Sequence, residues 1–150
     1  MRRLLSVALA LAALVVQAAS HHEIDFTVCE DAPFVPSSVT LDPYPPHPGS
    51  EIVLQIEGVA DHTMEGGEFY ADVTLVVYHH HIPMYKEKKD LCRQTACPID
   101  EGNVTFTYDK VLPPAVPAGL YNVNLQAEDL DGNLEMCLDL SFHITYFTEV

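Results

Sequence analysis

Apolar and polar residues alternate with a period of two along most of the chain beyond residue 20. A period of two places every second side chain on the same face of a β-strand, whereas a helix would repeat every 3.6 residues. Each segment has one apolar face and one mostly polar face, as expected of antiparallel strands with one side in water. The clearest segments are 52–57, 69–78, 104–108, 121–127 and 136–144.

Residues that break regular structure separate these segments. Proline and glycine are concentrated in 42–49, 65–67, 100–102 and 113–119, which predicts turns or loops there. Asp131-Gly132-Asn133 lies between two alternating segments and predicts a tight hairpin. Six to eight short strands without a helix predict an all-β fold, an immunoglobulin-like two-sheet antiparallel β-sandwich.

The first 20 residues have a different composition. Arg2 and Arg3 precede an apolar run from Leu4 to Val16, and small residues follow at 18–20. This order is typical of a secretory signal peptide, and the run is too short for a membrane-spanning helix. We therefore expect a leader over 1–20, a single domain over 21–150, and a secreted or lumenal location, whether extracellular, vacuolar or lysosome-like.

Four cysteines remain after the leader, and four cysteines allow three pairings. Cys92 and Cys97 enclose only four residues and close a local loop easily, which leaves Cys29 to pair with Cys137. Zinc ligation is the alternative, but Cys29 and Cys137 each lack a neighbouring ligand. Two disulfides agree with secretion, as does the glycosylation sequon at Asn103.

The charge of the chain excludes one class of partner. The sequence has 22 acidic and 7 basic residues, a formal net charge of −15. A field of this sign repels polyphosphate, so we expect no binding to nucleic acid.

Three features that resemble catalytic or metal sites are weak. His79-His80-His81 lacks a nearby carboxylate that would complete a metal site, although a metal-dependent hydrolase built on it is one alternative function. The segment 129–133 lacks the ligand spacing of a calcium loop. No Gly-x-Ser-x-Gly sequence is present. We expect no metal, no cofactor and no enzymatic activity.

Several motifs resemble those of a known family. They are the segment 29–34 followed by 39–43 and 45–52, Gly66-Gly67-Glu68-Phe69, the segment 90–99 with both cysteines, 117–121, and Met136-Cys137. Together they resemble the ML (lipid-recognition) domain family over about residues 29–144, most closely its phosphatidylglycerol/phosphatidylinositol transfer branch. The Niemann–Pick type C sterol carrier is a more distant relative with an additional early disulfide, whereas this chain has no cysteine between Cys29 and Cys92.

The resemblance implies a function. It implies two sheets that separate at one end, an apolar cavity between them, and a lipid ligand carried from membrane to membrane. A phospholipid is favoured over a sterol. We expect transient membrane contact and a monomer. The alternatives are a sterol carrier of the same fold and a secreted protein-interaction module with a solid core.

The inward-facing strand positions are the candidate lipid contacts, although the same residues would also fill an ordinary core. An apolar, proline-containing loop over 82–85 is expected at the cavity mouth, with 111–117 as the opposite lip. The candidate lipid contacts are Leu54, Ile56, Phe69, Val73, Leu75, Val77, Phe106, Leu112, Tyr121, Val123, Leu125, Leu138, Leu140 and Phe142. The candidate mouth residues are Ile82, Pro83, Met84, Tyr85 and Pro113.

Overall fold

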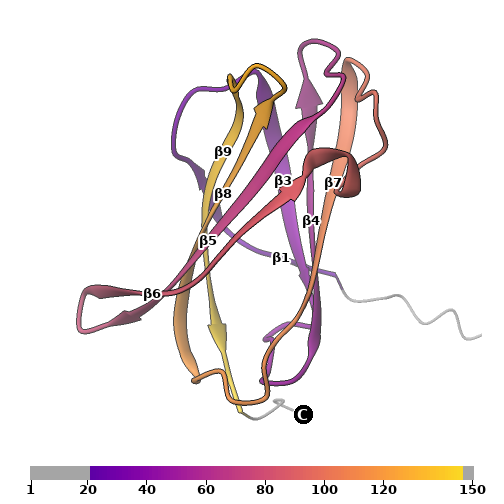
Figure 1. Cartoon of the computed structure of the whole chain (residues 1–150). Helices are drawn as coiled ribbons and strands as arrows, with labels where there is room; N and C mark the ends of the chain where they lie inside the picture. Colours follow the sequence, from indigo (N-terminus) through magenta and orange to yellow (C-terminus); the bar gives the residue numbers. More distant parts are fainter. Residues whose placement is uncertain (1–20, 147–150) are drawn as a thin grey trace, which may run out of the picture.

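A computed structural model describes residues 21–146 as two antiparallel sheets packed face to face, as predicted (Figure 1). The expected leader at 1–20 lies outside the described residues. The elements are β1 (His22–Glu23), β2 (Phe26–Val28), β3 (Phe34–Asp42), β4 (Glu51–Ala60), β5 (Gly67–Val77), β6 (His80–Asp90), the 3₁₀ turn η1 (Leu91–Arg93), β7 (Gly102–Val111), β8 (Gly119–Asp129) and β9 (Leu134–Ile144). None of the helical structure within 21–146 is long and apolar enough to cross a membrane.

The order of strands brings two edges together. One sheet has the order β1-β3-β4-β7 and the other the order β2-β9-β8-β5-β6. Strands β7 and β6 are therefore edge strands, and hydrogen bonds between their side chains place them on the same side of the sandwich. This side is closed by side chains instead of a backbone ladder, which matters for the site described below.

The inner faces of the sheets form the core at one end of the sandwich. Phe34 and Phe106 meet there edge to face, with ring centroids 5.0 Å apart. Gly58 of β4 makes room for this pair, because a Cβ at that position would lie 2.4 Å from the Phe34 ring and from the Val35 carbonyl oxygen. Both rings come from the same sheet, on β3 and β7, and are buried in the core between the sheets.

Both predicted disulfides are present. Cys29, which follows β2, is bonded to Cys137 of β9, and Cys92 is bonded to Cys97. Cys137 pairs with Gln126 in the register of β8 and β9, and Cys92 lies in η1 at the end of β6. Both bonds thus lie in the half of the sandwich that is remote from the β3–β4 and β7–β8 connections (Figure 1).

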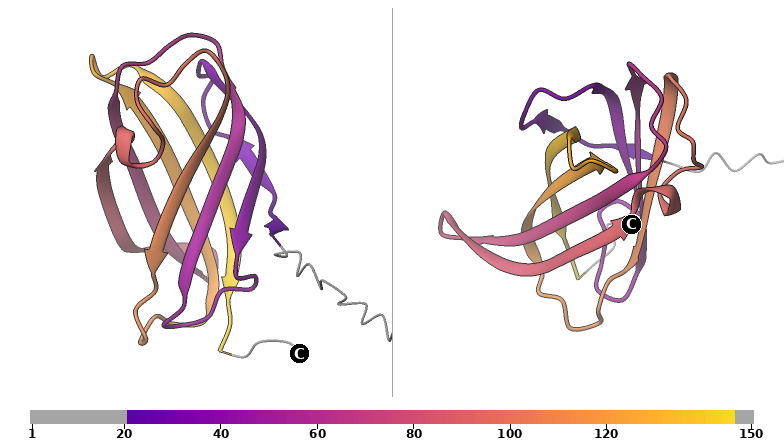
Figure 2. Two further views of the ribbon diagram at one scale, coloured as in Figure 1. Left: turned by 90° about the vertical axis from the view of Figure 1, so that its right-hand side faces the viewer. Right: turned by 45° about the horizontal axis from the view of Figure 1, so that its top comes forward.

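The expectation of a loop over 82–85 is wrong. These residues belong to β6, which pairs with β5 through Val77↔His80 to Glu68↔Asp90. Pro83 is accommodated because β6 is an edge strand and the register shifts beside it, between Val73 and Thr74. The β5–β6 hairpin bends away from the rest of the sandwich (Figure 2).

Candidate functional site

A cavity of about 340 Å³ lies between the two sheets, at the end that carries the β3–β4 and β7–β8 connections. Its volume is at the lower end of the range typical of ligand pockets, about 300–1,000 Å³. It receives side chains from both sheets and from the segment 112–117, which closes it below β7 and β8. Its lining residues are Leu41, Ile52, Leu54, Val73, Met84, Tyr85, Tyr108, Lys110, Leu112, Pro113, Ala115, Val116, Pro117, Tyr121, Val123, Phe142 and Ile144.

The wall of the cavity is almost entirely apolar. Leu54, Val123 and Phe142 are buried and present hydrocarbon from three strands. The hydroxyl of Tyr121 donates to the Pro117 carbonyl at 2.7 Å, so this buried phenol needs no further partner. Such a wall offers contact area and few hydrogen bonds, which suits a hydrocarbon chain better than a polar ligand.

Polar groups gather at one edge of the cavity, where β6 faces β7. The Tyr108 hydroxyl donates to Glu87 Oε2 at 2.7 Å. Lys110 Nζ donates to the Tyr85 hydroxyl, lies 4.2 Å from the centre of the Tyr85 ring, and is 3.4 Å from Glu87 Oε1. These four side chains, here called the β6–β7 clasp, join the edges of the two sheets.

The contacts within the clasp favour the charged forms of Glu87 and Lys110 and the neutral form of Tyr108. Burial acts to raise the pKa of Glu87, but hydrogen bonds from Tyr108 and Tyr85 and the nearby lysine charges together outweigh it, and the pKa is lowered. The pKa of Lys110 is raised, chiefly by its hydrogen bond to Tyr85. Burial and the Glu87 carboxylate raise the pKa of Tyr108, so the phenol keeps its proton.

Six of the candidate lipid contacts line the cavity: Leu54, Val73, Leu112, Tyr121, Val123 and Phe142. Ile56, Phe69, Phe106, Leu125, Leu138 and Leu140 are buried in the core but do not line it. Leu75 and Val77 lie half-buried near the projecting hairpin. Of the candidate mouth residues, Met84, Tyr85 and Pro113 line the cavity, whereas Ile82 and Pro83 do not.

Some lining residues escaped the sequence prediction although a signal for them exists. Leu41, Ile52 and Ile144 continue the inward-facing series of their strands. Tyr108 and Lys110 have the same parity as Phe106 along β7 and therefore face the same side. A lysine in an inward position is unusual, and parity alone could have singled it out.

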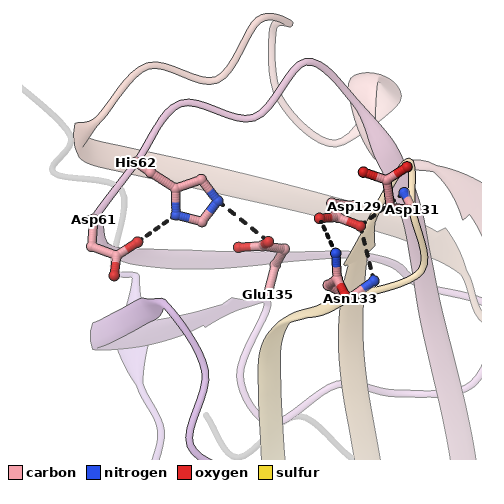
Figure 3. Close-up of polar contacts among 6 residues, drawn as sticks. All are labelled: Asp61, His62, Asp129, Asp131, Asn133 and Glu135. Carbon is pink, nitrogen blue, oxygen red and sulfur yellow. Dashed lines mark hydrogen bonds and ion pairs between the residues drawn. The ribbon is translucent and has the colours of Figure 1, made fainter.

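A second cluster of polar side chains lies at the remote end (Figure 3). The Glu135 side chain is only 4% exposed; its Oε1 lies 3.3 Å from His62 Nε2, and its Oε2 has no hydrogen-bond partner. His62 Nδ1 lies 2.5 Å from Asp61 Oδ1. Both ring nitrogens thus face carboxylate oxygens, which suits the doubly protonated imidazolium. The pKa of His62 is raised, chiefly by the hydrogen bond to Asp61, and burial raises the pKa of Glu135.

The two segments that the sequence analysis weighed as metal sites, 129–133 and His79-His80-His81, lie at the β8–β9 turn and at the β5–β6 turn with the start of β6. In the β8–β9 turn, Asp129 Oδ1 accepts hydrogen bonds from the backbone N–H groups of Asp131 (2.9 Å) and Asn133 (2.8 Å), so this segment is the predicted hairpin. His79 lies in the β5–β6 turn, and His81 Nδ1 lies 3.3 Å from Thr74 Oγ1. Within residues 21–146, no group of three or more histidine, cysteine, aspartate or glutamate side chains is arranged to hold a metal.

A two-sheet antiparallel sandwich with an apolar cavity between its sheets defines the structural class of this protein. The ML domain family matches residues 23–144, so the chain belongs to this family.

Named relatives agree with this assignment. The chain is 35% identical over 107 residues to the phosphatidylglycerol/phosphatidylinositol transfer protein of Aspergillus fumigatus, covering 68% of this chain and 59% of the relative. It is 29% identical over 116 residues to the protein of the same name from Mycosarcoma maydis, covering 73% of this chain and 58% of the relative. The matched region thus spans less than two thirds of either relative.

The fold agrees with a crystal structure of a Niemann-Pick type C2 protein from the Japanese carpenter ant. The TM-score is 0.62 at 15% sequence identity, and the match covers 81% of this chain and 99% of the ant protein. At this identity the similarity establishes the shared fold.

Proposed function

We propose that this protein binds a lipid by enclosing hydrocarbon in the inter-sheet cavity and carries it between membranes. The observation that carries the proposal is the cavity itself: about 340 Å³ of space with an apolar wall, in a sandwich whose other end is filled by buried apolar side chains. The chemistry is binding and release; the named relatives are transfer proteins, and the proposal requires no catalytic group.

Hydrocarbon burial supplies the driving force. Each methylene group removed from water contributes about 0.8 kcal/mol. About ten buried methylenes would contribute about 8 kcal/mol before the cost of ordering the chain is subtracted. The lipid-contact residues proposed here are the six candidates that line the cavity, together with Leu41, Ile52 and Ile144.

A phospholipid is the preferred ligand, specifically phosphatidylglycerol or phosphatidylinositol. The names of the two fungal relatives support this choice. A sterol is the second candidate, because the ant protein shares the fold and belongs by name to the Niemann-Pick type C2 proteins. Retention of phospholipid without sterol after purification separates the two.

The proposed setting is a secreted or lumenal compartment, reached through the leader at 1–20. Two disulfides support an oxidising compartment. Asn103 lies exposed on the edge strand β7, accessible to a glycan. We propose a monomer that touches the membrane transiently with its cavity end.

Blocking the cavity tests the function. Val73→Trp places a large ring in the space for hydrocarbon, and Val59→Trp places the same ring at an exposed position of β4. Fluorescent phosphatidylglycerol should move between vesicles with the wild type and Val59→Trp, and at least about tenfold more slowly with Val73→Trp. Native mass spectrometry should detect lipid bound to the wild type. A wild-type protein that neither retains nor transfers lipid would favour the protein-interaction module.

A further inference from the structure

Among the residues that the structure describes, Lys110 is the only charged one in the cavity wall, and its place in this acidic protein is unusual. The basic side chains within residues 21–146 are Lys86, Lys88, Lys89, Arg93 and Lys110. All lie on β6, η1 or β7, and only Lys110 borders the cavity. An ammonium group beside a hydrocarbon pocket loses hydration, so it needs anionic or hydrogen-bonding partners.

The partners of Lys110 come from the opposite sheet. Lys110 belongs to β7, whereas Tyr85 and Glu87 belong to β6. The ammonium group donates to the Tyr85 hydroxyl and lies 3.4 Å from Glu87 Oε1. An ammonium group has three N–H donors. Two are directed at these partners, and the third is available to a ligand at the edge of the cavity.

Lys110 does not have a carboxylate partner to itself. Glu87 is shared, because its Oε1 lies 3.4 Å from Lys110 Nζ and 3.6 Å from Lys89 Nζ. Lys89 also lies over the Tyr108 ring, 4.9 Å from its centre. The Glu87 carboxylate beside the cavity is thus shared by two ammonium groups. An anionic group at this edge would complete the cluster.

We propose that Lys110, held by Tyr85, receives the phosphate group of a phospholipid while an acyl chain occupies the cavity. This inference rests on the proposed function and adds the position of the headgroup. The phosphate lies at the β6–β7 edge, where the sheets are joined by side chains and a polar group can remain in water. A lipid with the same chains but no phosphate fills the cavity without completing the charge cluster.

The test compares two lipids that differ in the phosphoglycerol headgroup. Phosphatidylglycerol and diacylglycerol with identical acyl chains are bound to the wild type and to Lys110→Met, which keeps an apolar stem and removes the charge. The expected result is about a tenfold loss of affinity for phosphatidylglycerol with unchanged affinity for diacylglycerol. Lys88→Met is the matched control, because Lys88 pairs with Glu68 outside the cavity, at 2.6 Å.

Two further variants protect the test against a folding defect. Lys110→Arg keeps the positive charge and should retain the preference for phosphatidylglycerol. Tyr85→Phe removes the hydroxyl that positions the ammonium and should weaken phosphatidylglycerol binding selectively. Equal loss of both lipids in Lys110→Met and Tyr85→Phe, or no loss in either, would overturn the headgroup site. A wild type that binds both lipids equally would also overturn the headgroup site but would leave the carrier function intact. A wild type that binds neither lipid would overturn both the headgroup site and the carrier function.

Discussion

The two ends of the sandwich have the same alternation of apolar and polar residues, but one end has a filled core and the other contains a cavity. At the remote end, buried side chains from both sheets, among them Phe34, Phe106 and Leu125, form the core, and both disulfides lie in this half. At the other end, the inner faces leave a cavity that is also lined by the segment 112–117. The difference teaches that apolar inner faces alone do not make a solid core. What decides is how closely the sheets are held together.

The surfaces of the two ends differ in charge as well. The remote turns carry acidic residues at 61, 65, 100, 101, 129 and 131, whereas the segment 112–118 has no charged residue. An anionic membrane would repel the remote end and would face an apolar, proline-rich surface at the cavity end. This asymmetry supports the proposed direction of membrane contact.

Removal of the Cys29–Cys137 disulfide has the largest expected effect on this comparison. The bond spans 108 residues in sequence, and in the chain-entropy model a loop of this length contributes about 4–5 kcal/mol to the free energy of unfolding. The double variant Cys29→Ala/Cys137→Ala should lose about this amount in chemical denaturation. Cys92→Ala/Cys97→Ala opens a loop of only 5 residues and should lose about 2 kcal/mol. Equal losses would contradict the ranking.

Truncation of one leucine at each end gives the next largest effect. Leu125 is fully buried and does not line the cavity, whereas Leu54 lines it. Leu125→Ala creates a new void and should reduce the free energy of unfolding by about 3–4 kcal/mol. Leu54→Ala enlarges an existing space. In lipid-free protein it should therefore reduce the free energy of unfolding by about 1–2 kcal/mol less than Leu125→Ala does. Urea denaturation measures both, and a larger loss for Leu54→Ala would mean that the cavity end is the better packed.

The smallest expected effect is a pH dependence that originates at the remote end. The pKa of His62 is raised above 6.5 in the folded state, so its stabilising contribution is complete below about pH 6.5 and is lost as the pH rises through the folded pKa. The raised pKa of Glu135 acts in the same direction, because the folded state binds that proton more tightly. The groups with lowered pKa, such as Asp129, lose their contribution only at more acidic pH.

Thermal denaturation at several pH values measures this contribution. The melting temperature of the wild type should fall between about pH 6 and about pH 8, and His62→Gln should reduce the fall. His143→Gln, at an exposed position in the cavity half, is the matched control and should leave it unchanged. A wild-type profile that His62→Gln does not alter would place the titrating group elsewhere.

Much of the fold follows from local pattern. Alternation predicted the strand faces, the turn residues predicted the breaks, and the cysteine spacing predicted both disulfides. The prediction of a loop at 82–85 was wrong because a proline in the pattern resembles a break, yet an edge strand tolerates Pro83, which has no backbone N–H to donate. Its edge position depends on the order of strands, which is a property of the whole sheet.

For the site as well, the sequence pattern predicts one part and the tertiary structure decides the rest. Parity assigns Leu54, Leu125 and Lys110 to inward faces, because a strand directs alternate side chains to opposite sides. The alternation does not say which end of the sandwich an inward-facing residue occupies. It therefore does not distinguish Leu54 at the cavity from Leu125 in the packed core. The packing of one sheet on the other decides which end of the sandwich a residue occupies. It also brings β6 close to β7, so that Tyr85 and Glu87 reach Lys110. The separation of the two sheets is a long-range quantity, and a pattern of period two does not encode it.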